Sequence, residues 1–405
     1  MKKLLSVVLV LLMLAVMLPV TAMADDANYC TIEGVNGTFD TLTAAAKAWR
    51  ESKGVVTEGN TFGANNLGTV ESIVWDIYGT VPVGDGAGVA GDNGAGECIF
   101  TGGYFTPAVT VRKVTVTGHN NATISKTNND KYRVSVNADE VVFANITFED
   151  TMRNDSNPGS LTFTNCTFKA GLRMPHARDN STLKVENCVF TGSEEKGYAI
   201  FVQGNLANVA ISGNQISNAK CGMNIQTAPA TVSITGNTIT NLTGKDANGG
   251  KYGSAIQLTS GTSFTVTDNT INTKNVNAFH LYNGLNAAVT INNNIITTDY
   301  LIWNAANLEN ISSSGNTLDI KYPGKELVKV KLDDESEVVN TIDSATTING
   351  TVVEHPTTII ITPAGDTPKT EPEKNPTTGA NDMVAAAAAL MAVSALGMAV
   401  LSRKK

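Results

Sequence analysis

A short pattern of alternating apolar residues, V-x-I-x-x-N-x-I, recurs along this 405-residue chain and limits its fold more than any other feature. In "TVSITGNTIT" (231–240) it consists of Val232, Ile234, Asn237 and Ile239. The other copies with asparagine at the sixth position, the last one weaker, are Val209, Ile211, Asn214 and Ile216; Phe264, Val266, Asn269 and Ile271; Val289, Ile291, Asn294 and Ile296; and Ile311, Ser313, Asn316 and Leu318. Three earlier copies have Ile146, Cys166 and Cys188 at the sixth position, with Asn145, Asn165 and Asn187 one place before.

The spacing between copies indicates a repeat built from strands. Measured at the third position, successive copies are 20, 22, 26, 23, 32, 25 and 22 residues apart, so the base period is about 22 residues. Leucine-rich repeats have a comparable period, but their leucine pattern is missing here. The apolar residues alternate with period 2, which is typical of strands and excludes a helical repeat, and glycine and asparagine turns separate the segments.

A second short strand follows each copy, so one period holds about three strands and their turns. These second segments are "GLRMP" (171–175), "AIFVQ" (199–203), "GMNIQ" (222–226), "AIQLT" (255–259) and "AFHLY" (278–282). One such turn cannot bury its own apolar side, whereas turns stacked ~4.8 Å apart bury a continuous apolar column. The sequence therefore predicts an all-β protein folded as a parallel β-helix, a single-stranded solenoid.

The recurring asparagines are expected at the bends between strands. Asparagine tolerates the left-handed conformation, and its amide can bond the same group of the next turn. We therefore predict a ladder of stacked side chains, with asparagine as a plain turn marker as the alternative. The ladder consists of Asn214, Asn237, Asn269, Asn294 and Asn316.

The segment "FDTLTAAAKAWRESKG" (39–54) predicts a helix that covers the N-terminal end of the solenoid. Asp40 or Thr41 can cap it, and Gly54 can end it. Its apolar face consists of Leu42, Ala45, Ala46 and Trp49. The strands "ESIVWDIYG" (71–79) and "VRKVTVTG" (111–118) are expected to form the first turns.

The helix followed by such strands, ending in "VTVTGHNNATI" (114–124), resembles the right-handed parallel β-helix superfamily that includes pectin and pectate lyases. The resemblance covers about residues 38–320 and depends on the repeat pattern, not on a catalytic motif. It implies a right-handed coil. The motif "GHN" (118–120) resembles half of the "GHG" of polygalacturonases, without partner aspartates in the sequence around it.

The N-terminus reads as an export signal. Lys2 and Lys3 precede the apolar run 4–20, and the small residues around Ala24 predict cleavage before Asp25. The alternative is an uncleaved membrane anchor.

The C-terminus resembles the wall-sorting signal of Gram-positive surface proteins. Its motif "NPTTG" precedes a mostly apolar stretch (383–401), long enough to cross a ~30 Å bilayer core, and then three basic residues. The resemblance implies that a sortase cuts after threonine and joins it to peptidoglycan, so that the protein resides in the cell wall and touches the membrane only before sorting. The motif starts with asparagine instead of leucine, which leaves the sortase class open; a plain membrane anchor is the alternative. The motif residues are Asn375, Pro376, Thr377, Thr378 and Gly379, with the cut after Thr378.

These features divide the chain into six predicted segments. They are a signal peptide (1–24), an N-terminal cap with the first coils (25–130), the β-helix repeats (131–320), a C-terminal β cap (321–354), a Pro/Thr-rich wall spacer (355–374) and the sorting signal (375–405).

Charge and cysteine content exclude some classes of function. Without the signal and the tail after Thr378, the chain keeps 24 basic and 36 acidic residues, a net charge of about −12, which excludes an electrostatic footprint for nucleic acid. Five cysteines are too few for a disulfide scaffold. Cys166 and Cys188 occupy the same position in successive turns, within reach of a disulfide, but are expected as buried thiols. A pairing of Cys30 with Cys98 is left open.

The outward side chains of the second strands form the candidate binding site. If the apolar residues alternate inward, the outward positions form a strip of amides, hydroxyls and aromatic rings that repeats every ~4.8 Å. Such a strip suits an extended polysaccharide or host glycan; a solvated face without a ligand is the alternative. The strip consists of Arg173, Phe201, Gln203, Asn224, Gln226, Gln257, Thr259, His280 and Tyr282.

Evidence for catalysis in the sequence is weak. His280 and Tyr282 leave the same face of a strand and resemble a base and acid pair, and Arg173 could hold a uronate carboxylate. The strip lacks the paired carboxylates of a glycosidase. No cofactor is expected, although the loop residues Asp85, Asp92, Asn93 and Glu97 are a weak calcium candidate. The leading hypothesis is a non-catalytic glycan-binding adhesin; the alternatives are a polysaccharide lyase or glycoside hydrolase, and a structural stalk.

Overall fold

The structure is a computed structural model that describes residues 27–361 with gaps at 53–56, 59–60, 63–68, 85–96, 101–109, 126–133, 137, 154–157, 175–178, 229, 245–252, 275, 283–284, 299, 304–310, 321–336, 341–345, 349–350 and 354–357. The predicted cleavage site at Ala24 and Asp25, the sorting motif 375–379 and the apolar tail lie outside the described residues. Among the described residues, no helix is both long and apolar enough to span a membrane.

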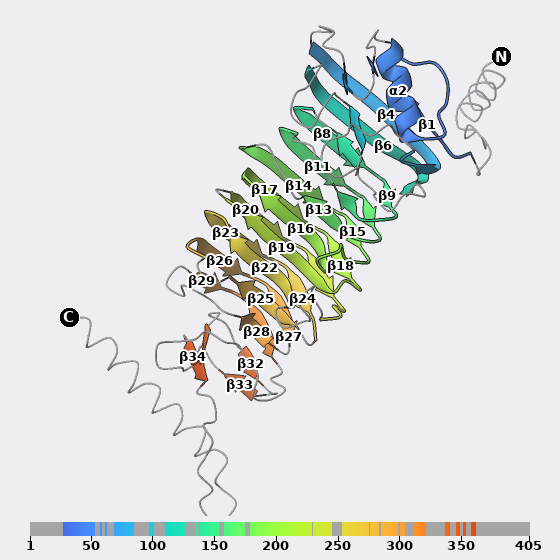
Figure 1. The fold of residues 1–405 in the computed structure, drawn as a ribbon. Coiled ribbons are helices and arrows are strands. Elements are labelled where there is room, and N and C mark those ends of the chain that lie inside the picture. Colours follow the sequence, from blue (N-terminus) through green and yellow to red (C-terminus); the bar gives the residue numbers. More distant parts are fainter. Residues whose placement is uncertain are drawn as a thin grey trace, which may run out of the picture.

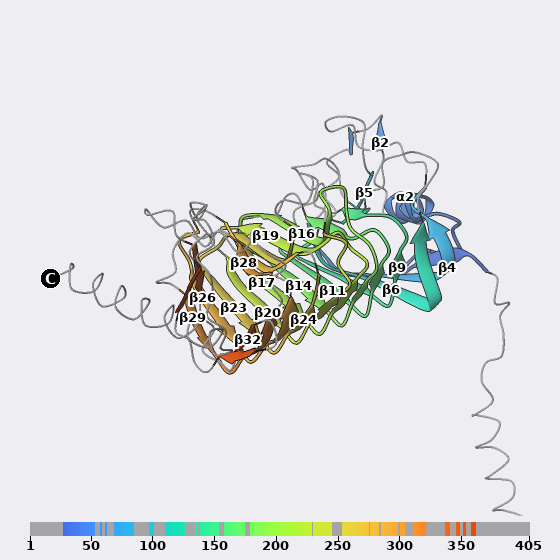
Figure 2. The same ribbon diagram turned by 90° about the horizontal axis from the view of Figure 1, so that it is seen from below.

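The chain coils into a solenoid of stacked parallel strands (Figure 1). Each regular coil contributes a first strand and a short strand to one large sheet, sheet A, and a third strand to a seven-stranded sheet, sheet B. In Figure 2, β16 and β19 of sheet B lie on the upper side of the solenoid and β24 of sheet A on the lower side. The predicted parallel β-helix is therefore confirmed.

The strand bounds follow the repeats. The first strands are β8 (Glu140–Ala144), β11 (Ser160–Thr164), β14 (Ser181–Glu186), β17 (Leu206–Ser212), β20 (Thr231–Thr235), β23 (Ser263–Thr267), β26 (Ala288–Asn292) and β29 (Ile311–Ser314). The short strands are β9 (Thr147–Phe148), β12 (Thr167–Phe168), β15 (Val189–Phe190), β18 (Gln215–Ser217), β21 (Thr238–Thr240), β24 (Thr270–Asn272), β27 (Ile295–Thr298) and β30 (Thr317–Ile320). Sheet B consists of β10 (Met152–Arg153), β13 (Leu172–Met174), β16 (Tyr198–Gly204), β19 (Cys221–Thr227), β22 (Ser254–Ser260), β25 (Asn277–Leu281) and β28 (Tyr300–Trp303).

The N-terminal end is closed by the predicted helix. Helix α2 (Leu42–Ser52) begins where the hydroxyl of Thr41 accepts the Ala44 N–H at 3.0 Å, so Thr41 is the cap. Its predicted apolar face is buried: Leu42, Ala45, Ala46 and Trp49 are at most 4% exposed. Beside it, β1 (Tyr29–Ile32) pairs antiparallel with β4 (Thr69–Pro82), which pairs parallel with β6 (Thr110–Ser125), the strand that leads into the coils. The remaining short strands in this region are β2 (Thr57–Glu58), β3 (Thr61–Phe62), β5 (Glu97–Phe100) and β7 (Val134–Val136).

The C-terminal end changes from parallel to antiparallel pairing. Strand β32 (Thr346–Ile348) adds to β30 and turns back through β33 (Thr351–Val353). Strand β31 (Glu337–Asn340) pairs with β34 (Thr358–Ile361), which lies inside the predicted wall spacer. The spacer prediction is therefore wrong at its start. Three consecutive isoleucines there favour a strand, and the prolines that prevent one stand before and after them.

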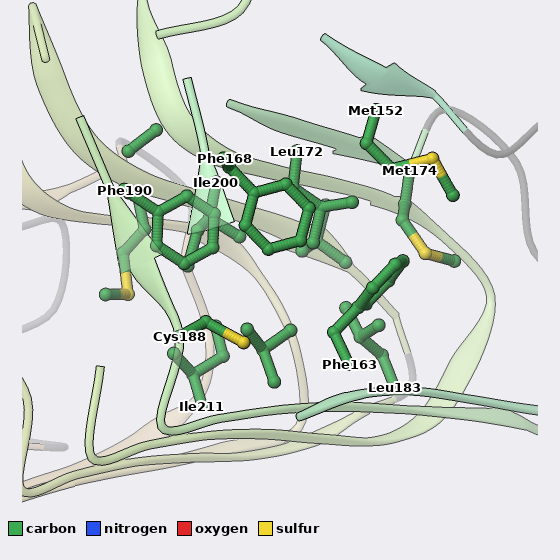
Figure 3. Close-up of a cluster of buried hydrophobic side chains, with 14 of the residues drawn as sticks. Met152, Phe163, Phe168, Leu172, Met174, Leu183, Cys188, Phe190, Ile200 and Ile211 are labelled. Carbon is green, nitrogen blue, oxygen red and sulfur yellow. The ribbon is translucent and has the colours of Figure 1, made fainter. Parts of the chain in front are cut away.

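The core is a column of identical or similar side chains at matching positions of successive coils. Phe148, Phe168 and Phe190 stack with ring centroids 5.0 and 4.5 Å apart, and Phe163 meets the edge of the Phe168 ring at 5.4 Å. Figure 3 shows Phe163, Phe168 and Phe190 pointing into the coil interior among Leu172, Leu183, Cys188 and Ile200. Toward the C-terminus isoleucine and leucine continue the column at Ile216, Ile239, Ile271, Ile296 and Leu318.

The asparagine ladder is confirmed. From each turn to the next, Nδ2 donates to Oδ1 at 2.8 Å for Asn214 to Asn237 and at 2.9 Å for Asn237 to Asn269, Asn269 to Asn294 and Asn294 to Asn316. Each backbone N–H along this run also donates to the next Oδ1, as Asn237 does to Asn269 at 2.9 Å. All five side chains are at most 2% exposed. The ladder thus satisfies polar groups that would otherwise be buried without partners.

The predicted bend geometry is wrong by one residue. The left-handed conformation belongs to the residue before each ladder position: Gly236 has φ 65°, Asp268 57° and Asn293 55°. The early asparagines Asn145, Asn165 and Asn187 also have positive φ, between 52° and 59°. One corner therefore needs two different residues. The first turns the backbone and is exposed to solvent, while the second points inward and must be either apolar or fully hydrogen-bonded.

The four cysteines whose side chains are described, Cys30, Cys166, Cys188 and Cys221, are buried and form no disulfide. Cys30 therefore does not pair with Cys98. Burial raises the pKa of Cys30 to about 12. Cys166 and Cys188 continue the ladder position as predicted buried thiols: the Cys166 N–H donates to Cys188 Sγ at 3.4 Å, and the Cys188 N–H donates to Asn214 Oδ1 at 2.8 Å.

Candidate functional site

The candidate site lies on the outer side of sheet B. Its inward positions are filled as predicted, because every one of them is at most 2% exposed: Ile200, Val202, Met223, Ile225, Ile256, Leu258, Phe279 and Leu281. One outward position of each strand faces the same position of the next strand in parallel register. We call this set the inner row; it consists of Arg173, Phe201, Asn224, Gln257 and His280.

The inner row is not open to solvent, which corrects the prediction of an exposed strip. Phe201 is 7% exposed, and His280 is 3% exposed. Asn224 and Gln257 are buried to a similar degree. The sequence pattern gives only the direction in which a side chain leaves the strand, so it could not show that these outward side chains are buried.

Hydrogen bonds join the inner row across the coils. The hydroxyl of Tyr198 on β16 donates to Gln257 Oε1 on β22 at 2.6 Å. Gln257 Nε2 donates to the Thr259 hydroxyl at 3.2 Å, and that hydroxyl donates to Asn224 Oδ1 at 2.9 Å. Sequence reasoning missed Tyr198, because it stands at the start of its strand, outside the alternating pattern. The network fixes the amide orientations, since each amide has a defined donor and acceptor.

A second set of outward side chains, the outer row, remains accessible. Gln203, Gln226 and Thr259 are partly exposed, and Tyr282 is 49% exposed. A one-residue irregularity in β22 places Ser260, not Thr259, opposite Gln226. The expected alignment of Thr259 with Gln226 is therefore wrong. The bulge lets the Thr259 hydroxyl contact the inner row instead, so Thr259 links the two rows.

His280 and Tyr282 lie close, as their spacing predicts. Their ring centroids are 6.2 Å apart with an interplanar angle of 50°. They differ in environment, because His280 is buried and Tyr282 is exposed. The described residues of the two rows contain no carboxylate, so the acidic partner of a glycosidase mechanism would have to come from elsewhere.

Charged groups gather at the N-terminal end of the site. The Arg173 guanidinium forms an ion pair with Glu195, and its Cζ lies 5.8 Å from the Phe201 ring centroid. Glu194, 2% exposed, accepts the Tyr198 N–H at 3.0 Å, and its Oε2 has no hydrogen-bond partner. Burial raises the pKa of the Glu194 carboxyl, although the Lys196 and Tyr198 N–H groups and the charge of Arg173 act in the opposite direction.

A further polar group lies near the N-terminal cap, where the sequence showed only "GHN". His119 Nε2 lies 2.7 Å from Asp76 Oδ1, so this histidine does have an aspartate partner, from the preceding coil. Its ring stacks on Tyr78 at 4.7 Å, and Tyr78 stacks on Tyr29 at 4.8 Å. The Tyr78 ring is therefore stacked against both the Tyr29 ring and the His119 ring. This arrangement ties β1 and β4 to β6, and aligning the two strands by their apolar pattern could have revealed it.

Most of the calcium candidate lies outside the described part of the chain. Asp85, Asp92 and Asn93 lie outside the described residues, and of Glu97 only the backbone in β5 is described. Among the described side chains, no group of three or more histidine, cysteine or acidic residues is placed to hold a metal ion.

Comparison with known proteins supports the architecture. The family model described as "Right handed beta helix region" matches residues 97–254 and 151–318, and these overlapping matches together span more than half of the chain. Neither the curated proteins nor the solved structures gave a significant match. The matched region contains both rows of the candidate site. From the family match and the stacked parallel coils together, the chain belongs to the right-handed β-helix family.

Proposed function

We propose that this protein is a cell-wall-anchored surface protein whose β-helix binds an extended glycan without catalysis. The observation that carries the binding proposal is that outward polar and aromatic side chains recur from coil to coil on sheet B, in register along the inner row and between Gln203 and Gln226. A polymer with a repeating unit can contact such a surface at several successive coils, because neighbouring parallel strands are ~4.8 Å apart.

The two rows have complementary roles in this proposal. Gln203, Gln226 and Tyr282 are accessible and supply amide groups and an aromatic ring for sugar hydroxyls and C–H faces. The buried amides Asn224 and Gln257 hold Thr259 in place through the hydrogen bonds given above. A site whose polar groups are already oriented loses less conformational entropy on binding.

Replacing Tyr282 by alanine tests the binding proposal. Tyr282 is the most exposed ring of the site, so its loss is expected to weaken binding of any glycan found on an array about tenfold or more, the effect of losing one well-placed aromatic contact. Ile295→Ala is the matched control, since Ile295 is 55% exposed on sheet A, away from the site. Equal affinities for both variants would contradict the proposed site.

A product assay on each bound glycan distinguishes binding from catalysis. Unchanged polymer length supports the non-catalytic proposal. New reducing ends would establish a hydrolase, and new unsaturated ends a lyase. If no glycan on the array binds, the structural stalk becomes the better description.

Wall anchoring is supported by the sequence alone and has its own test. In a Gram-positive host, the full-length chain is expected in the wall fraction, released by a peptidoglycan hydrolase. Thr378→Ala removes the residue that would join peptidoglycan and is expected to move most of the protein to the membrane fraction and the medium. The same distribution for both chains would overturn the sorting proposal.

A further inference from the structure

The N-terminal end of the site is the part of it where charge is concentrated, among the described residues. Arg153 on β10 and Arg173 on β13 are aligned in parallel register, so two guanidinium groups leave neighbouring strands toward the same side. Beyond them the inner row continues with the uncharged or aromatic Phe201, Asn224 and Gln257. Paired arginines are suited to carboxylates, which they bind by charge-assisted hydrogen bonds. Without compensation, this end would attract the uronic-acid units of an anionic polysaccharide.

The chain itself compensates these cations. Glu195 pairs with Arg173, whose side chain is only 13% exposed, while that of Glu195 is 65% exposed. The carboxyl of Glu194 is buried nearby and acts electrostatically on the same arginine. Arg153 is also engaged with other groups of the chain. The solvent-facing end of this cluster is thus the Glu195 carboxylate, which repels anionic ligands.

We propose that Glu195 determines the charge class of the ligand, so that the site accepts neutral glycans and rejects uronate polymers. This inference rests on the proposed glycan binding and narrows its ligand. The Gln203, Gln226 and Thr259 side chains can donate to and accept from sugar hydroxyls, whereas they cannot neutralise a carboxylate. A carboxylate desolvated against them without a cation is costly. The formal net charge of −8 for the whole chain further disfavours polyanions at low salt.

A pair of polymers with one backbone gives the sharpest test. Fully methyl-esterified polygalacturonate is neutral, and its de-esterified form is anionic. The purified full-length chain is expected to bind the ester at least about tenfold more tightly than the acid, the factor that corresponds to one charge-assisted hydrogen bond. Binding of the ester is expected to change little with salt.

Glu195→Gln removes the proposed determinant while keeping the size of the side chain. It removes one anionic partner of the Arg173 guanidinium and is expected to raise affinity for the acid form about tenfold, with little change for the ester. The control is Glu186→Gln, which makes the same change in net charge on β14 of sheet A, where Glu186 pairs with Lys184 at 2.7 Å. This control is expected to leave both affinities unchanged.

The outcomes separate the two proposals. Preference of the natural chain for the acid, or equal gains from Glu195→Gln and Glu186→Gln, would overturn the role of Glu195 and leave glycan binding in place. Absence of binding to either polymer and to every neutral polysaccharide of a glycan array would overturn both. Preference for neutral polymers, with a gain for the acid in Glu195→Gln alone, supports the inference.

Discussion

Replacing Asn237 by alanine is expected to lower the free energy of unfolding by about 3–5 kcal/mol, because several buried groups lose their partners at once. Its Oδ1 accepts both the N–H and the Nδ2 of Asn214, at 3.0 and 2.8 Å. Its Nδ2 donates to Asn269 Oδ1 and to the Ile211 carbonyl, both at 2.9 Å. Alanine can replace none of these bonds, and its site is too buried for solvent to do so freely.

Urea unfolding followed by circular dichroism measures this effect. Asn208→Ala is the control in the same part of the solenoid, since the Asn208 side chain on β17 is exposed. This substitution is expected to change the free energy of unfolding by no more than about 0.5 kcal/mol. A loss below about 1 kcal/mol for Asn237→Ala would mean that the ladder marks the turns without stabilising them.

Replacing Phe168 by alanine is expected to cost about 3–5 kcal/mol, the range for a large buried ring whose neighbours cannot close the cavity. Phe168 is fully buried and stacks between Phe148 and Phe190. The backbones above and below are held at a fixed spacing by the sheet hydrogen bonds, so the coil cannot collapse around the gap. Phe168→Leu keeps most of the volume and should cost clearly less.

The same unfolding experiment checks this second prediction. Ile295→Ala serves as the exposed apolar control and is expected to change stability by less than about 0.5 kcal/mol. If Phe168→Ala and Phe168→Leu were equally stable, the phenylalanine column would not be the close-packed core inferred from the ring distances.

The fold was predictable because the alternation in each repeat gives the direction of its side chains, and the turn residues give the positions of its bends. Alternation in "TVSITGNTIT" assigned Val232, Ile234 and Ile239 to the interior, and each is fully buried. Recurrence of the pattern then implied stacking. The handedness came from the family resemblance and the family match, since alternation is the same for either hand.

For the candidate site, the sequence predicted only the side of the sheet from which each side chain leaves its strand. The outward residues from Arg173 to His280 do share one side of sheet B. The Tyr198–Gln257 hydrogen bond joins two coils that are far apart in the sequence, and the bulge at Thr259 depends on one inserted residue. The pairing of Arg173 with Glu195 joins a strand to a later turn, and a repeat pattern contains no information about such a contact.

The sequence by itself determined the period, the inward column and the asparagine ladder, because these follow from local alternation repeated coil after coil. Only the tertiary structure decided that Gly236, and not Asn237, adopts the left-handed conformation. The sequence pattern marks the position of the corner, but it does not say which of these two adjacent residues turns the backbone. The tertiary structure also decided which outward side chains remain accessible. Burial on the outside of the solenoid depends on contacts between side chains of different coils, such as the Tyr198–Gln257 hydrogen bond, and these contacts are not periodic.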